Sequence, residues 1–233
     1  RFPTDGFALN VAGDMIVQGS NGRYDVGGTT YEVGFVNFHR PLSVTAPVLT
    51  DGGDLRLLTG GKLGVFSAPT PTNSLDHHGA WVRVAKDMYV DTNSWVYPYS
   101  HSTNGGSPRF TMKNLSVATN GGFNADNKGF GVKAAYYYYQ NTGPGGGLGS
   151  ASNLTGACYG GFGGDTNLVA QQRTYGSAMF PLDPGSAGGG YMSYTVPGSG
   201  GGAIRIEAEN RVAIAGTLTA NGATALASLA FSG

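Results

Sequence analysis

The amino-acid sequence predicts an all-β protein and, more specifically, a parallel β-helix, a solenoid in which the strands of successive repeats stack on one another. Three observations favour this fold: apolar side chains alternate with a period of two, similar units recur, and Asn and Gly fall at matching corners. Alternation with this period is typical of strands, whose successive side chains point to opposite faces. A β-sandwich or jelly roll, whose strands alternate in the same way, is the alternative fold.

Four units carry the repeated order of strand, turn and strand. They begin near residues 55, 82, 110 and 204, so the first three are spaced by 27 and 28 residues. A single unit cannot bury its inward face alone, so each must stack on a copy of itself. The inward positions expected from the alternation are Leu55, Leu57, Leu63, Val65, Val82, Val84, Val90, Phe110, Met112, Leu115, Val117, Ile204, Ile206, Val212, Ile214 and Leu218.

The stretch between the third and fourth units holds most of the glycine, which numbers 41 of the 233 residues. Clusters such as GPGGGLGS and GSAGGG are interrupted by aromatic residues, which flexible linkers rarely carry. We therefore interpret residues 143–202 as a packed insertion, in which glycine backbones approach closely and aromatic rings fill the space between them. The chain thus divides into a strand-rich N-terminal extension at 1–50 and β-helix repeats at 51–233 that contain this insertion.

Composition excludes some classes of protein and favours others. Fourteen Lys and Arg balance fourteen Asp and Glu, so the chain lacks the positive charge on which nucleic-acid binding depends. No apolar run approaches the roughly 20 residues that a membrane-spanning helix needs. Few Lys and Glu, a single cysteine and abundant Asn, Thr, Ser, Tyr and Gly favour an extracellular or cell-surface protein. Two sequons make Asn114 and Asn153 candidate glycosylation sites.

One part of the chain resembles a known group of proteins. A Tyr-Gly-Ser, a proline and a Gly-Ser pair precede a glycine-rich approach to a strand, which leads to a corner ending in Ala-Asn-Gly. This order resembles bacterial glycine-rich surface proteins with right-handed parallel β-helix domains. The resemblance implies an extracellular structural or adhesive role, usually without known enzymology. The matching positions are Tyr175, Gly176, Ser177, Pro181, Gly185, Ser186, 200–204 and 216–222.

Carboxylates are the candidate catalytic groups, because β-helical proteins often act on polysaccharides. A glycosidase needs two carboxylates about 5–10 Å apart that flank one bond. Asp87 and Asp91 lie at the two ends of a predicted strand. The remaining candidates are Asp51, Asp54, Asp126, Asp165 and Asp183. Asp is common at corners because of turn chemistry alone, so we predict no catalytic residue and keep a polysaccharide-degrading enzyme as the second alternative function.

Ligands for a metal are few. The histidines are His39, His77, His78 and His101. Adjacent side chains, such as those of His77 and His78, point in opposite directions on an extended chain. The loops at 51–54 and 124–127 supply Asp and Asn oxygens, but calcium takes six to eight and neither loop matches a full motif. We expect no cofactor, with calcium as the alternative, and we expect Cys158 to be a small buried side chain.

Two segments are candidate subunit interfaces. One is a block of four tyrosines, a residue type enriched at protein interfaces; stacking on sugar rings is the alternative role. The other is the uncharged run at 223–231, which suits strand addition to a neighbouring molecule. The interface residues expected from these segments are Tyr136, Tyr137, Tyr138, Tyr139, Leu226, Leu229 and Phe231.

The function expected from these features is that of an extracellular structural protein that self-associates through strand edges into a filament or surface layer. Unpaired strand edges invite pairing with another chain, and head-to-tail contacts that do not close give filaments. The partner is then a second copy of the chain. The alternative is a carbohydrate- or host-binding adhesin module, with surface glycans as partners.

Overall fold

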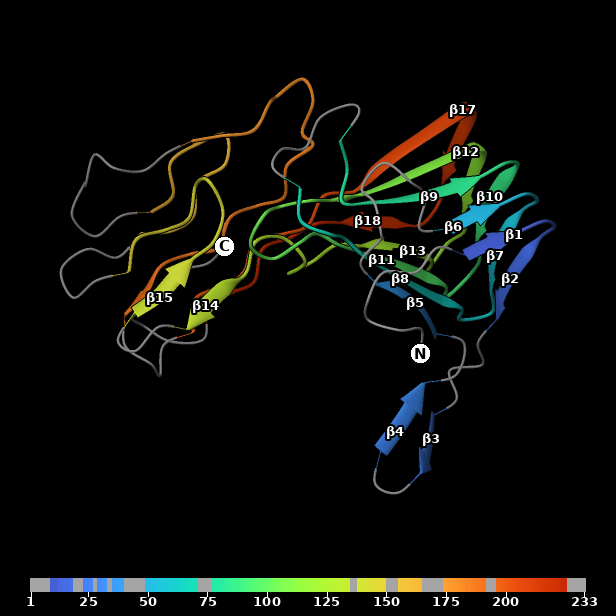
Figure 1. Cartoon of the computed structure of the whole chain (residues 1–233), viewed down its shortest axis with the longest axis horizontal. Coiled ribbons are helices and arrows are strands. Elements are labelled where there is room, and N and C mark those ends of the chain that lie inside the picture. Colours follow the sequence, from blue (N-terminus) through green and yellow to red (C-terminus); the bar gives the residue numbers. More distant parts are fainter. Residues whose placement is uncertain are drawn as a thin grey trace.

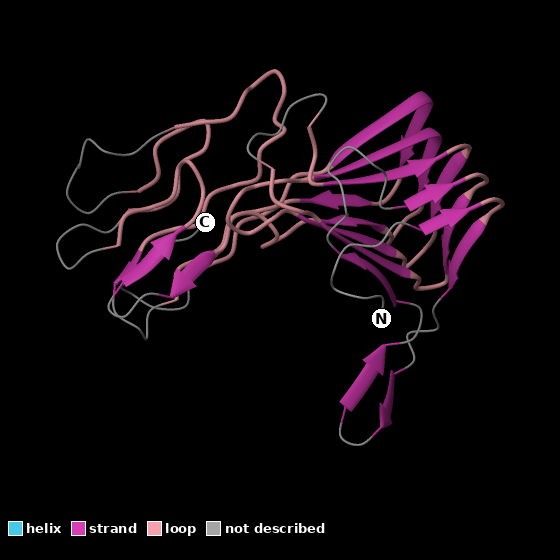
Figure 2. Ribbon diagram, in the orientation of Figure 1, coloured by secondary structure: helices cyan, strands magenta, loops and turns pink. Residues whose placement is uncertain are grey.

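The computed structural model describes residues 9–18, 23–26, 29–32, 35–39, 49–70, 77–134, 138–149, 155–164, 174–191 and 196–225. These residues form eighteen strands and no helix, so they contain no helix long and apolar enough to cross a membrane (Figure 2). The strands are β1 (Leu9–Val11), β2 (Met15–Gln18), β3 (Arg23–Val26), β4 (Thr29–Glu32), β5 (Phe35–His39), β6 (Leu49–Asp51), β7 (Leu55–Leu58), β8 (Lys62–Phe66), β9 (Ala80–Val84), β10 (Asp87–Val90), β11 (Trp95–Tyr99), β12 (Pro108–Val117), β13 (Gly122–Asn124), β14 (Val132–Ala134), β15 (Tyr138–Asn141), β16 (Gly190–Tyr191), β17 (Arg205–Ile214) and β18 (Thr217–Thr219).

The main body is a parallel barrel. A path of seven parallel strands runs in the order β1-β6-β9-β12-β10-β7-β2 and is nearly closed, with β17 paired to β12 outside the path (Figure 1). A five-stranded parallel sheet, in the order β18-β13-β11-β8-β5, lies beside it.

This arrangement corrects the prediction of a parallel β-helix, because the seven strands belong to one continuous sheet. β12 is unbroken over ten residues, pairs with β9 through its first half and with β10 through its second half, and so joins the two sides. The alternative, a β-sandwich, is also wrong, since sandwiches are built from antiparallel sheets and every pair along this path is parallel.

The chain builds the barrel in five rounds, and each round pairs with the next. We define the rounds by their strands: β1, β2 and β5; β6, β7 and β8; β9, β10 and β11; β12 and β13; β17 and β18. The pairing register aligns equivalent residues in columns, such as Met15, Leu55, Met88, Leu115 and Val212. Residues 9–18 and 35–39, within the predicted N-terminal extension, therefore supply the first round of the barrel.

The alternation of apolar and polar residues determines which side chains form the core. Side chains at every second position of each strand point inward, and those of the second to fourth rounds are buried together, as the sequence predicts. The confirmed inward residues are Leu55, Leu57, Leu63, Val65, Val82, Val84, Val90, Phe110, Met112, Leu115 and Val117. In the fifth round the register keeps the predicted inward direction, but the expected burial is incomplete: Ile204 and Ile206 are only half-buried, and Val212, Ile214 and Leu218 are exposed.

The glycine-rich insertion packs through its backbone, as predicted. It lies beside the barrel in Figure 1 as extended segments, with the short sheet β14-β15-β16 at its far end. The Gly185 N–H donates to the Gly201 carbonyl at 2.8 Å, and the Gly200 N–H donates to the Phe130 carbonyl at 2.9 Å. A Cβ at Gly200 would lie 1.8 Å from the Gly185 oxygen, so only glycine allows this approach.

Candidate functional site at the open end of the barrel

The fifth round leaves an apolar surface uncovered. Within the described residues, β17 pairs with β12 and β18 with β13, and neither strand has a partner on its other side. Val212 is 50 % exposed and Leu218 42 %, whereas their column neighbours Leu115 and Phe123 are 1 % and 0 % exposed. The register gives Leu115 and Val212 the same inward direction, so Val212 is exposed because no strand of the described residues covers the fifth round.

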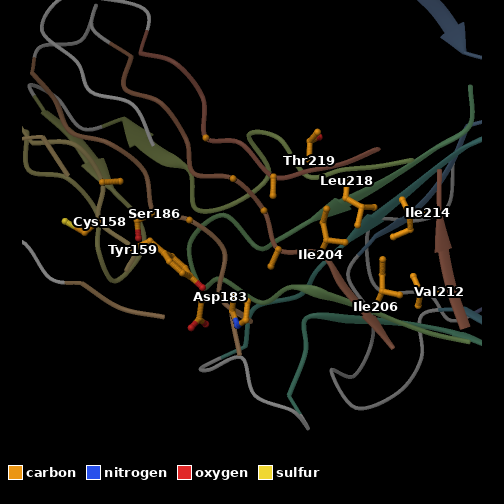
Figure 3. A pocket seen from close by; sticks show the side chains of 18 residues that line it. Cys158, Tyr159, Asp183, Ser186, Ile204, Ile206, Val212, Ile214, Leu218 and Thr219 are labelled. Atoms are coloured by element: carbon orange, nitrogen blue, oxygen red, sulfur yellow. The ribbon is translucent and has the colours of Figure 1, made fainter. Parts of the chain in front are cut away.

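A cavity of about 780 Å³ opens at this end of the barrel. Figure 3 shows its two parts: the side chains of Ile206, Val212 and Leu218 gather on one side, and Tyr159 and Asp183 lie on the other. The apolar part is the inward face of the fifth round, and the polar part comes from the glycine-rich insertion. A second apolar surface in contact with the first part would therefore extend the core of the barrel.

The polar part is supported from behind by Tyr175, which contacts the lining residue Ser186. The Tyr175 hydroxyl donates to the Pro184 carbonyl oxygen at 2.5 Å and accepts from the Ser186 Oγ at 2.9 Å. Burial raises the pKa of Tyr175 well above its ordinary value, so the phenol stays protonated at neutral pH. The ring of the lining residue Tyr159 meets that of Tyr175 edge to face, with 4.8 Å between their centres.

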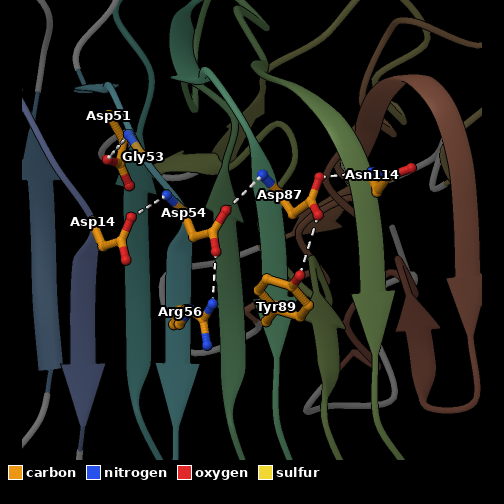
Figure 4. Close-up of polar contacts among 8 residues, drawn as sticks. All are labelled: Asp14, Asp51, Gly53, Asp54, Arg56, Asp87, Tyr89 and Asn114. Atoms are coloured by element: carbon orange, nitrogen blue, oxygen red, sulfur yellow. Dashed lines mark hydrogen bonds and ion pairs between the residues drawn. The ribbon is translucent and has the colours of Figure 1, made fainter.

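A column of polar side chains ties successive rounds together at one corner of the barrel (Figure 4). The Asp14 Oδ1 accepts from the Asp54 N–H at 2.9 Å, the Asp54 Oδ1 from the Asp87 N–H at 3.2 Å, and the Asp87 Oδ1 from the Asn114 Nδ2 at 2.7 Å. A hydrogen bond of 2.6 Å from Arg56 holds the pKa of Asp54 below its usual range. Each carboxylate thus satisfies a donor of the following round.

The outer wall near the open end carries a cluster of charges. Arg109 and Arg205 each contact the Glu207 carboxylate at 2.6 Å, and the Arg109 guanidinium lies 5.1 Å from the centre of the Trp81 ring. Burial acts to raise the pKa of Glu207, but these hydrogen bonds outweigh it and the net direction is down. His78 packs against Trp81 and is buried, and burial together with Arg109 lowers its pKa to about 4.

Most of the predicted interface residues are not among the residues that the structure describes. Tyr136, Tyr137, Leu226, Leu229 and Phe231 are outside the described residues, as is the sequon residue Asn153. The two described tyrosines of the block lie in β15, where Tyr139 pairs antiparallel with Ala134 in β14 and Tyr138 pairs with Tyr191 in β16. The other sequon residue, Asn114, lies in the corner column.

The candidate catalytic carboxylates are engaged in local contacts. Asp87 begins β10 and accepts from Asn114 and from the Tyr89 hydroxyl, while Asp91 follows the strand and accepts from the Thr92 N–H. Asp126 binds the backbone and side chain of Asn221 in the next round. Asp165 lies outside the described residues. These carboxylates are therefore distributed over several corners.

Potential metal ligands are also dispersed. Among the described residues no group of three His, Cys, Asp or Glu side chains is placed to hold a metal ion. In the 124–127 loop the Asn124 oxygen accepts from the Asp126 N–H and from the Lys128 ammonium group at 3.3 Å. Asp51 is fully buried and accepts from the Gly53 N–H at 3.0 Å, and burial raises its pKa. Cys158 is buried, as predicted.

Searches against protein-family models, curated proteins and solved structures find no significant match to this chain. Sequence reasoning missed the apolar surface at the open end because it treated the fifth round as interior.

Proposed function

We propose that this protein is an extracellular structural protein that associates with copies of itself through the open edge of its barrel, forming a filament or surface layer. The observation that carries the proposal is the exposure of Val212, Ile214 and Leu218 at inward positions of the fifth round. An apolar surface of this kind is costly in water, and burying it against another molecule is favourable.

The backbone of the same edge supports the proposal. β17 is ten residues long, and within the described chain one side of it has no strand partner. Natural proteins usually blunt such edges, because unpaired N–H and C=O groups template pairing with another strand. The whole chain has a formal net charge of zero, so little repulsion opposes association.

An extracellular location fits the composition. Charged residues make up only 12 % of the chain, and Gly, Ser, Thr, Asn and Tyr are abundant. A role in assembly needs no catalytic residue and no cofactor. Such a role needs a well-packed body with exposed strand edges. The core of the barrel and the hydrogen-bonded glycine-rich insertion supply the packed body.

Analytical ultracentrifugation of the full chain over a wide range of concentrations tests the proposal. The inward substitution Ile214→Lys places a charge in the exposed apolar surface, while Ala213→Lys places it on the other face of the same strand. We expect concentration-dependent association of the wild type, at least a ten-fold weakening by Ile214→Lys, and little change by Ala213→Lys. A wild type that stays monomeric at every concentration contradicts the proposal.

A further inference from the structure

The two ends of the barrel carry matching apolar residues. Leu9, Val11 and Met15 in the first round are half-buried against the core, as are Ile206 and Ala208 in the fifth. Each set packs on the interior from one side only. The first round combines inward apolar side chains with a strand edge. A further round placed on the fifth would need the same two features.

The register shows how the two ends correspond. One column begins at Leu9 and continues through Leu49, Val82 and Phe110 to Ile206. A first round placed above the fifth, with the same register, sets Leu9 of one copy opposite Ile206 of the other. In a second column the same shift sets Met15 opposite Val212, because that column begins and ends with these residues.

The corner column adds a charge argument. Its members are Asp14, Asp54, Asp87 and Asn114, and the residue aligned with Asn114 in the fifth round is Arg211. Arg211 is exposed and, within the described residues, makes no ion pair or hydrogen bond. When one molecule is stacked on the next, Asp14 in the first round of one copy becomes the neighbour of Arg211 in the fifth round of the other. Opposite charges at a contact fix register and partner orientation.

A two-fold contact is less compatible with the barrel. Pairing β17 with the β17 of a second copy about a two-fold axis makes the two strands antiparallel, whereas every strand pair in the two large sheets is parallel. An isologous contact also closes after two molecules, and a head-to-tail contact does not.

We propose that the β17–β18 end of one molecule docks on the β1–β2 end of the next in parallel register, with Arg211 of the first beside Asp14 of the second. This inference rests on the proposed function and names its partner surface, which is the first round of a second copy of this chain. Repetition of the contact builds a polar filament with the same end of every molecule pointing in one direction.

Charge reversal at the two ends tests the pairing. Asp14→Lys and Arg211→Glu each place like charges at the contact between identical molecules, so each variant alone is expected to associate about five-fold more weakly than wild type at low salt. In an equimolar mixture every contact between unlike molecules again joins opposite charges. Association of the mixture is therefore expected to return to the wild-type level. Lys86→Glu, an exposed reversal in the third round, is the matched control and is expected to leave association unchanged.

The outcomes separate the two proposals. A monomeric wild type overturns self-association itself. A wild type that associates while neither reversal weakens it, or weakened variants that the mixture does not rescue, overturns the Arg211–Asp14 contact and leaves self-association standing. Thermal unfolding of each variant shows whether the barrel is intact, and rescue by mixing cannot arise from a folding defect.

Discussion

The backbone N–H of Asp87 donates a hydrogen bond of 3.2 Å to the Oδ1 of Asp54, which lies 33 residues earlier in the chain and one round away in the barrel. The Asp54 N–H makes the equivalent bond to Asp14 at 2.9 Å, 40 residues earlier. Segments distant in sequence are thus held in register at a corner by carboxylates, beside backbone bonds such as that from the Met15 N–H to the Asp54 carbonyl at 2.9 Å.

Asp87→Ala removes the acceptor of two side-chain hydrogen bonds, from Asn114 at 2.7 Å and Tyr89 at 3.1 Å. We expect a loss of about 1–2 kcal/mol in the free energy of unfolding, measured by urea denaturation. Asp91→Ala is the control, because its carboxylate accepts only from the N–H of the adjacent Thr92 among the described hydrogen bonds. Equal losses for the two variants would show that the column does not stabilise the fold.

Gly200→Ala tests the packing of the glycine-rich insertion. The added Cβ would lie 1.8 Å from the Gly185 oxygen, so the two backbones must separate and break neighbouring hydrogen bonds. We expect destabilisation of about 3 kcal/mol or more. At Gly161 nothing lies within 4 Å of an added Cβ, and Gly161→Ala should be neutral in the same thermal-unfolding experiment. A neutral Gly200→Ala would contradict the close backbone approach.

Leu115 and Val212 occupy one column but differ in exposure, 1 % against 50 %. Leu115→Asp buries an unpaired charge in the core and is expected to cost about 4 kcal/mol or more. Val212→Asp is expected to cost about 1 kcal/mol or less in the monomer, because water reaches the carboxylate. Circular dichroism on heating compares the two, and a Val212→Asp variant as unstable as Leu115→Asp would mean that the fifth round is covered.

Acid should weaken the fold through His78. Burial and the neighbouring Arg109 and Arg205 charges lower its pKa in the folded state to about 4, against an ordinary value of 6.5. The unfolded chain therefore binds a proton that the folded chain does not, and stability falls as the pH drops from about 6.5 towards 4. The full effect is on the order of 3 kcal/mol, because one pKa unit corresponds to about 1.4 kcal/mol.

Urea denaturation across this pH range measures the His78 contribution. In His78→Phe the extra loss of stability below pH about 6.5 should disappear, because the titrating group is gone. His77→Gln, at the exposed neighbouring position, is the control and should keep the wild-type slope. An unchanged slope in His78→Phe would show that another group causes the loss.

The alternation in the sequence predicted the strands and core of the middle rounds because period two reports which side chains share a face. Leu63 and Val96, for example, are aligned in neighbouring strands and buried. Alternation does not report how the faces join: residues 108–117 continue as one strand through the expected corner, which produced the barrel in place of the predicted solenoid.

The sequence did not predict the exposure of the candidate site, because covered and uncovered rounds share the same alternation. Val212 and Leu218 have the same pattern as Leu115 and Phe123, and only the absence of a further described round distinguishes them. The corner column left a trace that sequence reasoning did not use. In every round a polar residue directly precedes the apolar member of the Met15–Val212 column, as in Asp14-Met15 and Arg211-Val212.

Electron microscopy of the purified wild-type chain at high concentration tests the central claim, assembly through the open strand edges, most directly. We expect filaments whose length grows with concentration. Monodisperse particles at every concentration would contradict assembly through the open strand edges.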